Sequence, residues 1–314
     1  MAEPGRHRVE HEILVSAPAA DVYRLLAEVE NWPRIFPPTI HVDHLERSDR
    51  TERIRIWATA VGRPKTWTSR RTLDAAALRI DFRQEVSTPP VASMGGTWII
   101  EPHTTGDCTI RLLHDYTAID DDPAGLAWID EAVDTNSRSE LAALKTNVER
   151  TVQAAELTFS FEDTVFIDGD AKDVYDFVNE AHLWHERLPH VATVHLEEHE
   201  PGLQTLQMDT RAPNGTVHTT KSHRVCFPDE RIHYKQTTLP ALMDLHTGRW
   251  TFRPARQGVS AASQHTVVLK TENITAVLGQ DAGVADARRH VRNALSANSR
   301  ATLDLAKAYA EGRR

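Results

Sequence analysis

Residues 17–23 read Ala-Pro-Ala-Ala-Asp-Val-Tyr, and residues 169–175, at an offset of 152 positions, read Gly-Asp-Ala-Lys-Asp-Val-Tyr. Further matches follow in the same order in both halves: Trp32 with Trp184, Pro37 with Pro189, Gly96–Trp98 with Gly248–Trp250, and Asn136–Arg138 with Asn298–Arg300. An internal repeat constrains an architecture more strongly than local propensity does. The length of 314 residues also suits two domains of typical size. We therefore predict two tandem domains of one fold, residues 1–153 and residues 154–314.

Composition narrows the classes of function. With 40% hydrophobic residues and a net charge of −9, the chain is typical of a folded globular protein. Binding to nucleic acid is not expected, because phosphate contacts need clustered Lys and Arg. No run of about 18 apolar residues suggests a membrane span, and no apolar signal-peptide core is present, so we expect a cytoplasmic protein. The two cysteines, Cys108 and Cys226, predict no disulfide framework, and no metal site is expected.

Each half is expected to run from a strand through short helices to a meander. In the first half a strand at residues 11–16 precedes a helix that starts at Ala17-Pro18, where proline's fixed φ suits a first turn. Trp-Pro and Phe-Pro-Pro then end the helical region, because a residue before proline avoids the α conformation. Alternating apolar and polar residues predict five strands, at residues 52–60, 65–73, 78–86, 96–101 and 109–117.

A long helix closes each half. The first begins at Asp120-Asp121-Asp122-Pro123, a sequence of acidic caps and an N1 proline. Its expected inward residues are Leu126, Ile129, Val133, Leu144 and Val148, and those of the second helix, at residues 281–310, are Val284, Val291, Leu295 and Leu305. A long helix across a curved antiparallel sheet leaves a cavity between the two. The sequence therefore predicts an α+β fold of two helix-grip domains.

Three motifs carry a resemblance to a known family: Trp32–Pro37, Trp67–Arg71 and Asn136–Arg138. At these motifs the chain resembles the polyketide aromatase/cyclases of the helix-grip (START/Bet v 1-like) superfamily, and its doubling resembles the di-domain branch in type II polyketide synthases. The resemblance implies C7–C12 first-ring closure and aromatisation of a C9-reduced poly-β-ketone tethered to an acyl carrier protein. It implies no cofactor. Contacts with a ketosynthase or a ketoreductase would follow.

The resemblance places the family's cavity arginine on Arg71, with Ser69 and His114 as further catalytic candidates. Alternation along a strand agrees, because Trp67, Ser69 and Arg71 then share one face and Arg70 lies on the other. A guanidinium stays charged and can hold the enolate or ketone oxygen of an aldol addition. His114 is expected to exchange protons near neutral pH.

Substrate contacts are expected from aromatic and apolar residues and from the second copy. The candidates are Trp32, Phe36, Trp67, Met94, Trp98, Arg224 and Ser222. In the second copy Thr220 takes the place of the motif tryptophan, and Thr271 is expected to stand where the first copy has His114.

Alternatives stay open for each of these residues and for the whole chain. Arg71 can instead be a strand arginine paired with a carboxylate, the tryptophans can simply pack the core, and Arg224 can be structural. The chain as a whole can be a noncatalytic polyketide or lipid carrier, or a scaffold for synthase subunits. An acidic carrier protein would be met by basic residues near a cavity mouth, for which Arg34, Arg63 and Lys65 are candidates.

Overall fold

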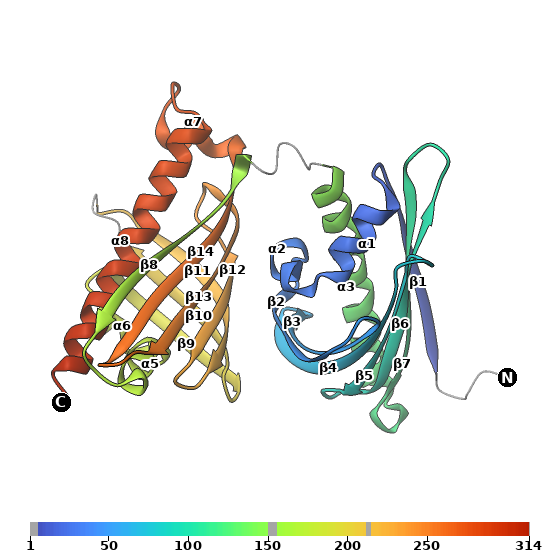
Figure 1. Cartoon of the computed structure of the whole chain (residues 1–314), viewed down its shortest axis with the longest axis horizontal. Coiled ribbons are helices and arrows are strands. Elements are labelled where there is room, and N and C mark those ends of the chain that lie inside the picture. The colour runs from blue at the N-terminus through green and yellow to red at the C-terminus, as the bar shows by residue number, and fades with distance from the viewer. Residues whose placement is uncertain (1–5, 150–155, 212–214, 314) are drawn as a thin grey trace. The chain divides into compact units, whose positions relative to one another are not determined.

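The computed structural model describes residues 6–149, 156–211 and 215–313. The chain divides into two compact units, Met1–Thr151 and Val152–Arg314 (Figure 1). The boundary predicted between residues 153 and 154 lies outside the described residues. Each unit contains seven antiparallel strands in one sheet and a long C-terminal helix.

The first unit begins with strand β1 (His7–Val15), the short helix α1 (Ala19–Ala27), the 3-10 turn η1 (Val29–Asn31) and helix α2 (Trp32–Ile35). Six strands follow: β2 (Thr39–Arg47), β3 (Thr51–Ala60), β4 (Arg63–Asp74), β5 (Arg79–Val86), β6 (Val91–Pro102) and β7 (Cys108–Ala118). The 3-10 turn η2 (Ile119–Asp121) leads into α3 (Pro123–Glu149). The order β1-β7-β6-β5-β4-β3-β2 makes the sheet a meander whose last strand returns beside the first.

The second unit repeats this order. It begins with β8 (Thr158–Ile167), α5 (Ala171–Asn179), η3 (Ala181–Leu183) and α6 (Trp184–Arg187). Its meander consists of β9 (Val191–Glu200), β10 (Leu203–Arg211), β11 (Val217–Phe227), β12 (Arg231–Thr238), β13 (Met243–Pro254) and β14 (Val259–Leu269). It ends with η4 (Thr271–Asn273), α7 (Ile274–Leu278) and α8 (Val284–Glu311), and its sheet order is β8-β14-β13-β12-β11-β10-β9.

The long helices form where the sequence predicts them. Helix α3 begins at Pro123, and the Asp122 carboxylate accepts a hydrogen bond of 2.8 Å from the Gly125 backbone N–H. The apolar face of α3 is buried, with Ile129 and Leu144 fully inaccessible to solvent. Helix α1 begins one residue later than expected, at Ala19, with Pro18 as its N-cap.

Three strand predictions were incomplete. Strand β1 spans His7–Val15 and so begins four residues before the predicted segment, residues 11–16. Strand β2 was missed, because Phe-Pro-Pro was interpreted as a break and the segment behind it alternates poorly. Strand β6 begins at Val91 instead of Gly96, since its first half holds small residues that carry little strand propensity. The additions in β2 and β6 lengthen the wall of the sheet that faces α3.

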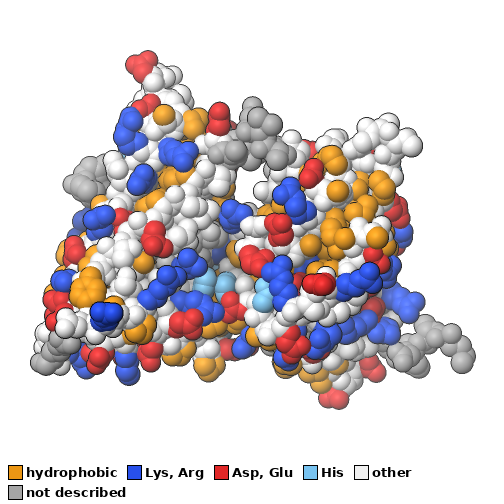
Figure 2. Space-filling model, in the orientation of Figure 1, with side chains coloured by type: hydrophobic (Ala, Val, Ile, Leu, Met, Phe, Trp, Pro, Cys, Tyr) orange, Lys and Arg blue, Asp and Glu red, His pale blue; other side chains and the backbone are white. Residues whose placement is uncertain are grey.

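Each sheet curves around its own long helix (Figure 1). Among the strands, each long helix contacts mainly the two at one edge of its sheet, β1 and β7 in the first unit and β8 and β14 in the second. On the face shown in Figure 2, acidic and basic side chains are interspersed over each unit. Among the residues that the structure describes, no helix has the length and apolar character needed to cross a membrane.

Candidate active site

Two adjoining cavities, of about 140 and 100 Å³, lie between α3 and the sheet of the first unit. Every residue predicted for this site in the first half lines at least one of them. The lining residues shared by both cavities include Trp32, Trp67, Met94 and His114, and the smaller cavity adds Phe36, Ser69, Arg71 and Trp98. The two spaces share these walls, and together they are named the first cavity.

Strand β4 delivers the motif residues to this cavity by simple alternation. Ser69 and Arg71 are both 2% exposed, whereas Arg70 between them points to solvent and pairs with Glu85 and Glu46. Trp67, two residues earlier on the same face, also lines the cavity. The side chains of a strand point to opposite faces in turn, so the motif places one cation inside and one outside.

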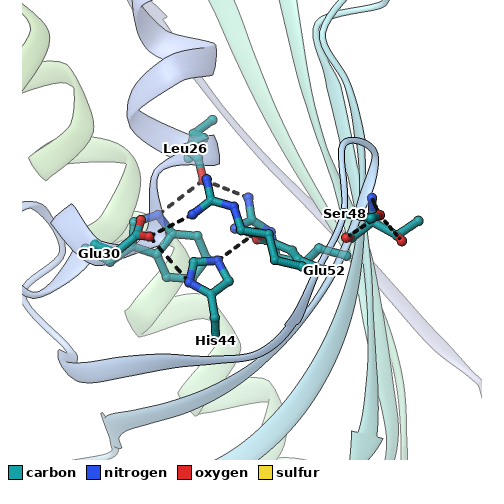
Figure 3. A network of polar contacts seen from close by, with 9 residues as sticks. Leu26, Glu30, His44, Ser48 and Glu52 are labelled. Atoms are coloured by element: carbon teal, nitrogen blue, oxygen red, sulfur yellow. Dashed lines mark hydrogen bonds and ion pairs between the residues drawn. The ribbon is translucent and has the colours of Figure 1, made fainter.

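The guanidinium of Arg71 is half of a buried ion pair. Its Nη1 donates to Glu52 Oε1 at 2.6 Å, and its Nη2 donates to the Leu26 carbonyl at 2.7 Å. The other Glu52 oxygen lies 2.9 Å from Nε2 of His44 (Figure 3). The second ring nitrogen of His44, Nδ1, lies 3.4 Å from a carboxylate oxygen of Glu30. Burial lowers the pKa of Arg71 to about 10, and Glu52 opposes that shift, so the arginine is charged at pH 7. Arg71 thus faces the cavity and is also paired with a carboxylate, as the alternative interpretation anticipated.

Aromatic rings hold this cation in place. The Trp32 ring lies 4.9 Å from the centre of the Arg71 guanidinium, and its indole N–H donates to the same Leu26 carbonyl at 3.3 Å. Phe36 contacts Trp32 edge-on and stacks on Trp98. Trp32-Pro33 begins helix α2 and does not end the helical region as predicted, because proline fits a first helical turn. This turn supplies both a cation–π partner for Arg71 and one wall of the cavity.

His114 is neutral at pH 7, contrary to the expectation of proton exchange near neutrality. Burial is the main cause and lowers its pKa to about 4, with a smaller contribution from nearby His11. Its Nδ1 has no hydrogen-bond partner among the described residues, and its ring meets Phe82 edge-on. His114 therefore lies in the cavity as a neutral hydrogen-bonding group.

Glu140, which the sequence interpretation missed, is the acid of the first cavity. It projects from α3 and lines both cavities together with His114 and Met94. Burial raises its pKa to about 8, so this carboxyl holds a proton at pH 7. Its position one turn after the buried Ser137, and in phase with Val133, was the signal that could have found it.

A cavity of about 110 Å³ occupies the same place in the second unit, and Arg224, Ser222 and Thr220 line it. Arg224 Nη2 donates to the Val178 carbonyl at 2.8 Å, and the guanidinium lies 5.5 Å from the Trp184 ring. These contacts match those of Arg71 with Leu26 and Trp32, residue for residue.

Strand register corrects the predicted counterpart of His114. Gly96 pairs with His114 in the first sheet, and Gly248 pairs with His265 in the second, so His265 occupies the equivalent position. Thr271 lies outside the sheet, in η4. The second unit has an additional helix, α7, between this turn and its long helix.

His265 belongs to a buried polar cluster that the sequence interpretation also missed. Its Nδ1 lies 2.9 Å from both the Tyr234 hydroxyl and His246 Nε2, and its Nε2 lies 2.7 Å from the Ser299 hydroxyl. Burial lowers the pKa of His265 to about 4 and that of His246 well below its ordinary value. In residues 6–149, 156–211 and 215–313, no three His, Cys, Asp or Glu side chains gather as metal ligands would.

Comparisons with known proteins agree with this architecture. A family model described as polyketide cyclase / dehydrase and lipid transport matches residues 6–149 and 158–311. A granaticin polyketide synthase bifunctional cyclase/dehydratase of Streptomyces virginiae is 57% identical over 94% of this chain and 97% of its own length. An actinorhodin polyketide synthase bifunctional cyclase/dehydratase of Streptomyces coelicolor is 48% identical and covers 99% of both chains.

Solved structures show the same doubled fold. The di-domain ARO/CYC BexL from the BE-7585A biosynthetic pathway is 68% identical, with a TM-score of 0.86 over 97% of this chain and 99% of that one. The di-domain ARO/CYC StfQ from the steffimycin pathway is 36% identical, with the same TM-score and coverage. The predicted pair of α+β domains, each with a long helix across an antiparallel sheet, is confirmed. The chain belongs to the polyketide cyclase/dehydrase family, as one of its di-domain aromatase/cyclases.

Proposed function

We propose that this aromatase/cyclase closes the first ring of a C9-reduced poly-β-ketone between C7 and C12 in its first cavity, and then dehydrates it, while the chain stays tethered to an acyl carrier protein. The observation that carries the proposal is that Arg71, Ser69, His114 and protonated Glu140 all line one space. A cation, neutral hydrogen-bonding groups and a proton donor are the groups that aldol closure and loss of water require.

In the aldol step an enolate carbon attacks a ketone, and negative charge moves to the ketone oxygen. The N–H groups of Arg71 and the hydroxyl of Ser69 lie on the wall where they can donate to that oxygen. Glu140 holds the proton that the departing hydroxyl needs in the second step. His114, being neutral, orients a carbonyl by a hydrogen bond and not by charge.

Shape supplies the regiochemistry. Because a free poly-β-ketone closes in several registers, a cavity that admits one fold of the chain selects one ring. Trp32, Phe36, Trp67, Met94 and Trp98 form the apolar part of that wall. Reaction without a cofactor fits these groups, since neither step changes the oxidation state of the substrate.

Basic residues near the first cavity are proposed as contacts for the acyl carrier protein. Lys65 lines the larger cavity, where its Nζ donates to the Pro89 carbonyl at 3.2 Å and lies 5.8 Å from the Trp128 ring. Arg34 and Arg63 are exposed. Ketosynthase and ketoreductase subunits are further proposed partners.

Reconstitution with the minimal synthase and its ketoreductase tests the proposal. We expect Arg71→Gln to yield the unaromatised shunt products that form without this protein, as resolved by mass spectrometry. Arg70→Gln on the exposed face of the same strand is the matched control and should keep the wild-type product. The double variant Arg71→Gln with Glu52→Gln guards against misfolding, because it leaves no unpaired buried charge.

A noncatalytic carrier is the second candidate, and the buried pairing of Arg71 with Glu52 is the observation that favours it. A carrier needs the cavity but not the guanidinium. Unchanged products from the double variant would therefore support a carrier or scaffold and reject arginine chemistry in the first cavity.

A further inference from the structure

The two cavity arginines differ in the residue that stands opposite them. On the neighbouring strand, Glu52 pairs in register with Arg71, whereas Gln204 pairs in register with Arg224. Gln204 is buried, and its amide donates to Glu198 at 3.1 Å and to Asn179 at 3.4 Å. The second unit thus keeps the arginine of the first but not its carboxylate.

Arg224 is consequently a buried cation with an unused donor. Only 3% of the residue is exposed, and Nη1 has no hydrogen-bond partner among the described residues. Its other contacts are the Val178 carbonyl and the Trp184 ring. Glu198 acts on it electrostatically from beyond Gln204, without forming an ion pair with it among the described residues. Burying a charge is unfavourable unless hydrogen bonds or a counter-charge compensate it. An anionic oxygen from a ligand in this cavity would supply both.

Two lining positions of the second cavity carry polar side chains where the first unit has apolar ones, which argues against a decayed copy. Strand register places Tyr234 where the first unit has Phe82, and the repeat places His246 where it has Met94. Both line the cavity with Arg224 and His265. Tyr234, His246 and His265 are hydrogen-bonded to one another, so they present neutral donors and acceptors to a ligand.

We propose that the second cavity is a separate binding site for the enolate of a 1,3-dicarbonyl segment, with Arg224 Nη1 on one oxygen and the Tyr234–His246–His265 cluster on the other. The ligand class rests on the proposed function, since poly-β-ketones and their cyclised forms contain such segments. The site itself rests on the free donor of Arg224 and on the missing carboxylate. In the first cavity Glu52 already neutralises the charge of Arg71 and accepts one N–H of its Nη1. The remaining N–H groups of Arg71 therefore suit the neutral ketone of the proposed aldol step better than a ligand that arrives as an enolate.

Calorimetric titration of the full chain with cyclohexane-1,3-dione, which is an enolate in neutral water, tests this site. We expect one binding equivalent in the wild type and at least tenfold weaker binding of the neutral ketone cyclohexanone. Arg224→Gln should weaken the dione by about tenfold to a hundredfold, the usual effect of losing a charge-assisted hydrogen bond. Gln204→Glu places a carboxylate opposite Arg224, as Glu52 stands opposite Arg71 in the first cavity. It should weaken dione binding by a similar factor, although the arginine is still present.

The reciprocal variant Glu52→Gln should add dione binding instead of removing it. Freed from its carboxylate, Arg71 should create a second dione equivalent in the first cavity. The inference is overturned if dione binding survives both Arg224→Gln and Gln204→Glu, or if cyclohexanone binds equally well. Circular dichroism and thermal melts confirm that each variant is folded. Because product analysis of Arg71 variants is a separate measurement, failure here leaves the proposed function standing, and failure there leaves this site intact.

Discussion

At the scale of single residues, the two buried arginines should respond in opposite ways to the same substitution. Arg71→Met removes one partner of a buried ion pair and leaves Glu52 without its counter-charge. We therefore expect the free energy of unfolding to fall by about 3–5 kcal/mol. Arg224→Met removes a buried cation that no described carboxylate contacts, so stability should be unchanged or higher by about 1 kcal/mol. Calorimetric melting of the full-length variants measures both. Equal losses would mean that Arg224 has a compensating partner.

The raised pKa of Glu140 predicts a pH-dependent stability. The unfolded chain releases this proton near the ordinary value of 4.5, whereas the folded chain holds it to about pH 8. The free energy of unfolding therefore falls between these two pH values and stays reduced above them, by roughly 3–5 kcal/mol from this group alone. Comparing urea unfolding of wild type and Glu140→Gln from pH 5 to pH 9 isolates the effect. Parallel curves for the two proteins would show that the carboxyl is ionised throughout.

The same proton should matter for turnover. If Glu140 donates to the departing hydroxyl, dehydration should decline as the pH passes about 8, and Glu140→Gln should accumulate the cyclised but hydrated product. Product ratios measured across this pH range provide the test. A Glu140→Gln enzyme that makes the wild-type product would assign the proton to another donor.

The sequence identified the arginine but not the groups that set its chemistry. Strand alternation and the motif were sufficient to place Arg71 and Ser69 on the cavity face. Glu52 was missed because its role depends on the register between β3 and β4, although it is in phase with the buried Ile54 and Ile56. The neutrality of His114 was unpredictable because the pKa depends on burial, which only the packed structure reveals.

At the scale of strands, the repeated glycine of the Gly-x-Trp motif has a steric cause. A Cβ on Gly96 would lie 1.9 Å from the Leu113 carbonyl of β7 and 2.7 Å from the Phe82 ring. We therefore expect Gly96→Ala to lower the free energy of unfolding by about 3 kcal/mol or more. The backbone of β6 or β7 must move to make room for the Cβ, and the cavity wall moves with it.

Gly95→Ala is the matched control from the same strand. Its Cβ would meet only the guanidinium end of Arg83, a partly exposed side chain that can move aside. Gly95→Ala should lower the free energy of unfolding by about 1 kcal/mol or less. Thermal melts of the two variants give the comparison, and similar losses would refute close strand packing as the reason for the motif.

The positions of the strands along the sequence could be predicted where apolar and polar residues alternate regularly. Strands β3, β4, β5 and β7 were predicted to within two residues at each end, because their apolar residues alternate cleanly. Strand β2 has four consecutive buried residues at its start and charged residues at its end, a pattern that does not alternate. Its pairing with β3 is a tertiary property, and local sequence does not encode it.

At the scale of the whole chain, the repeat has kept the fold and diverged in the chemistry of its cavities. The first cavity combines an arginine paired with a carboxylate and a protonated carboxyl, and the second combines an arginine whose Nη1 is unpaired among the described residues with neutral histidines. At the helix position of Glu140 the second copy has Thr302, which also lines its cavity. Two cavities with different donors are suited to different tasks on one substrate, reaction in the first and binding of an enolate in the second.

This division of chemistry predicts complementation between chains. Arg71→Gln should block ring closure, whereas Arg224→Gln should slow product formation and accumulate the enolate-bearing species that the second cavity binds, since each variant lacks a different cavity group. If the intermediate travels on its carrier protein, an equimolar mixture of the two variants should restore the wild-type product, because each variant supplies the cavity that the other lacks. Mass spectrometry of the reconstituted synthase distinguishes the cases. Identical intermediates from both variants would mean that the cavities perform one step, and the chemical differences between Arg71 and Arg224 would then concern affinity and not reaction.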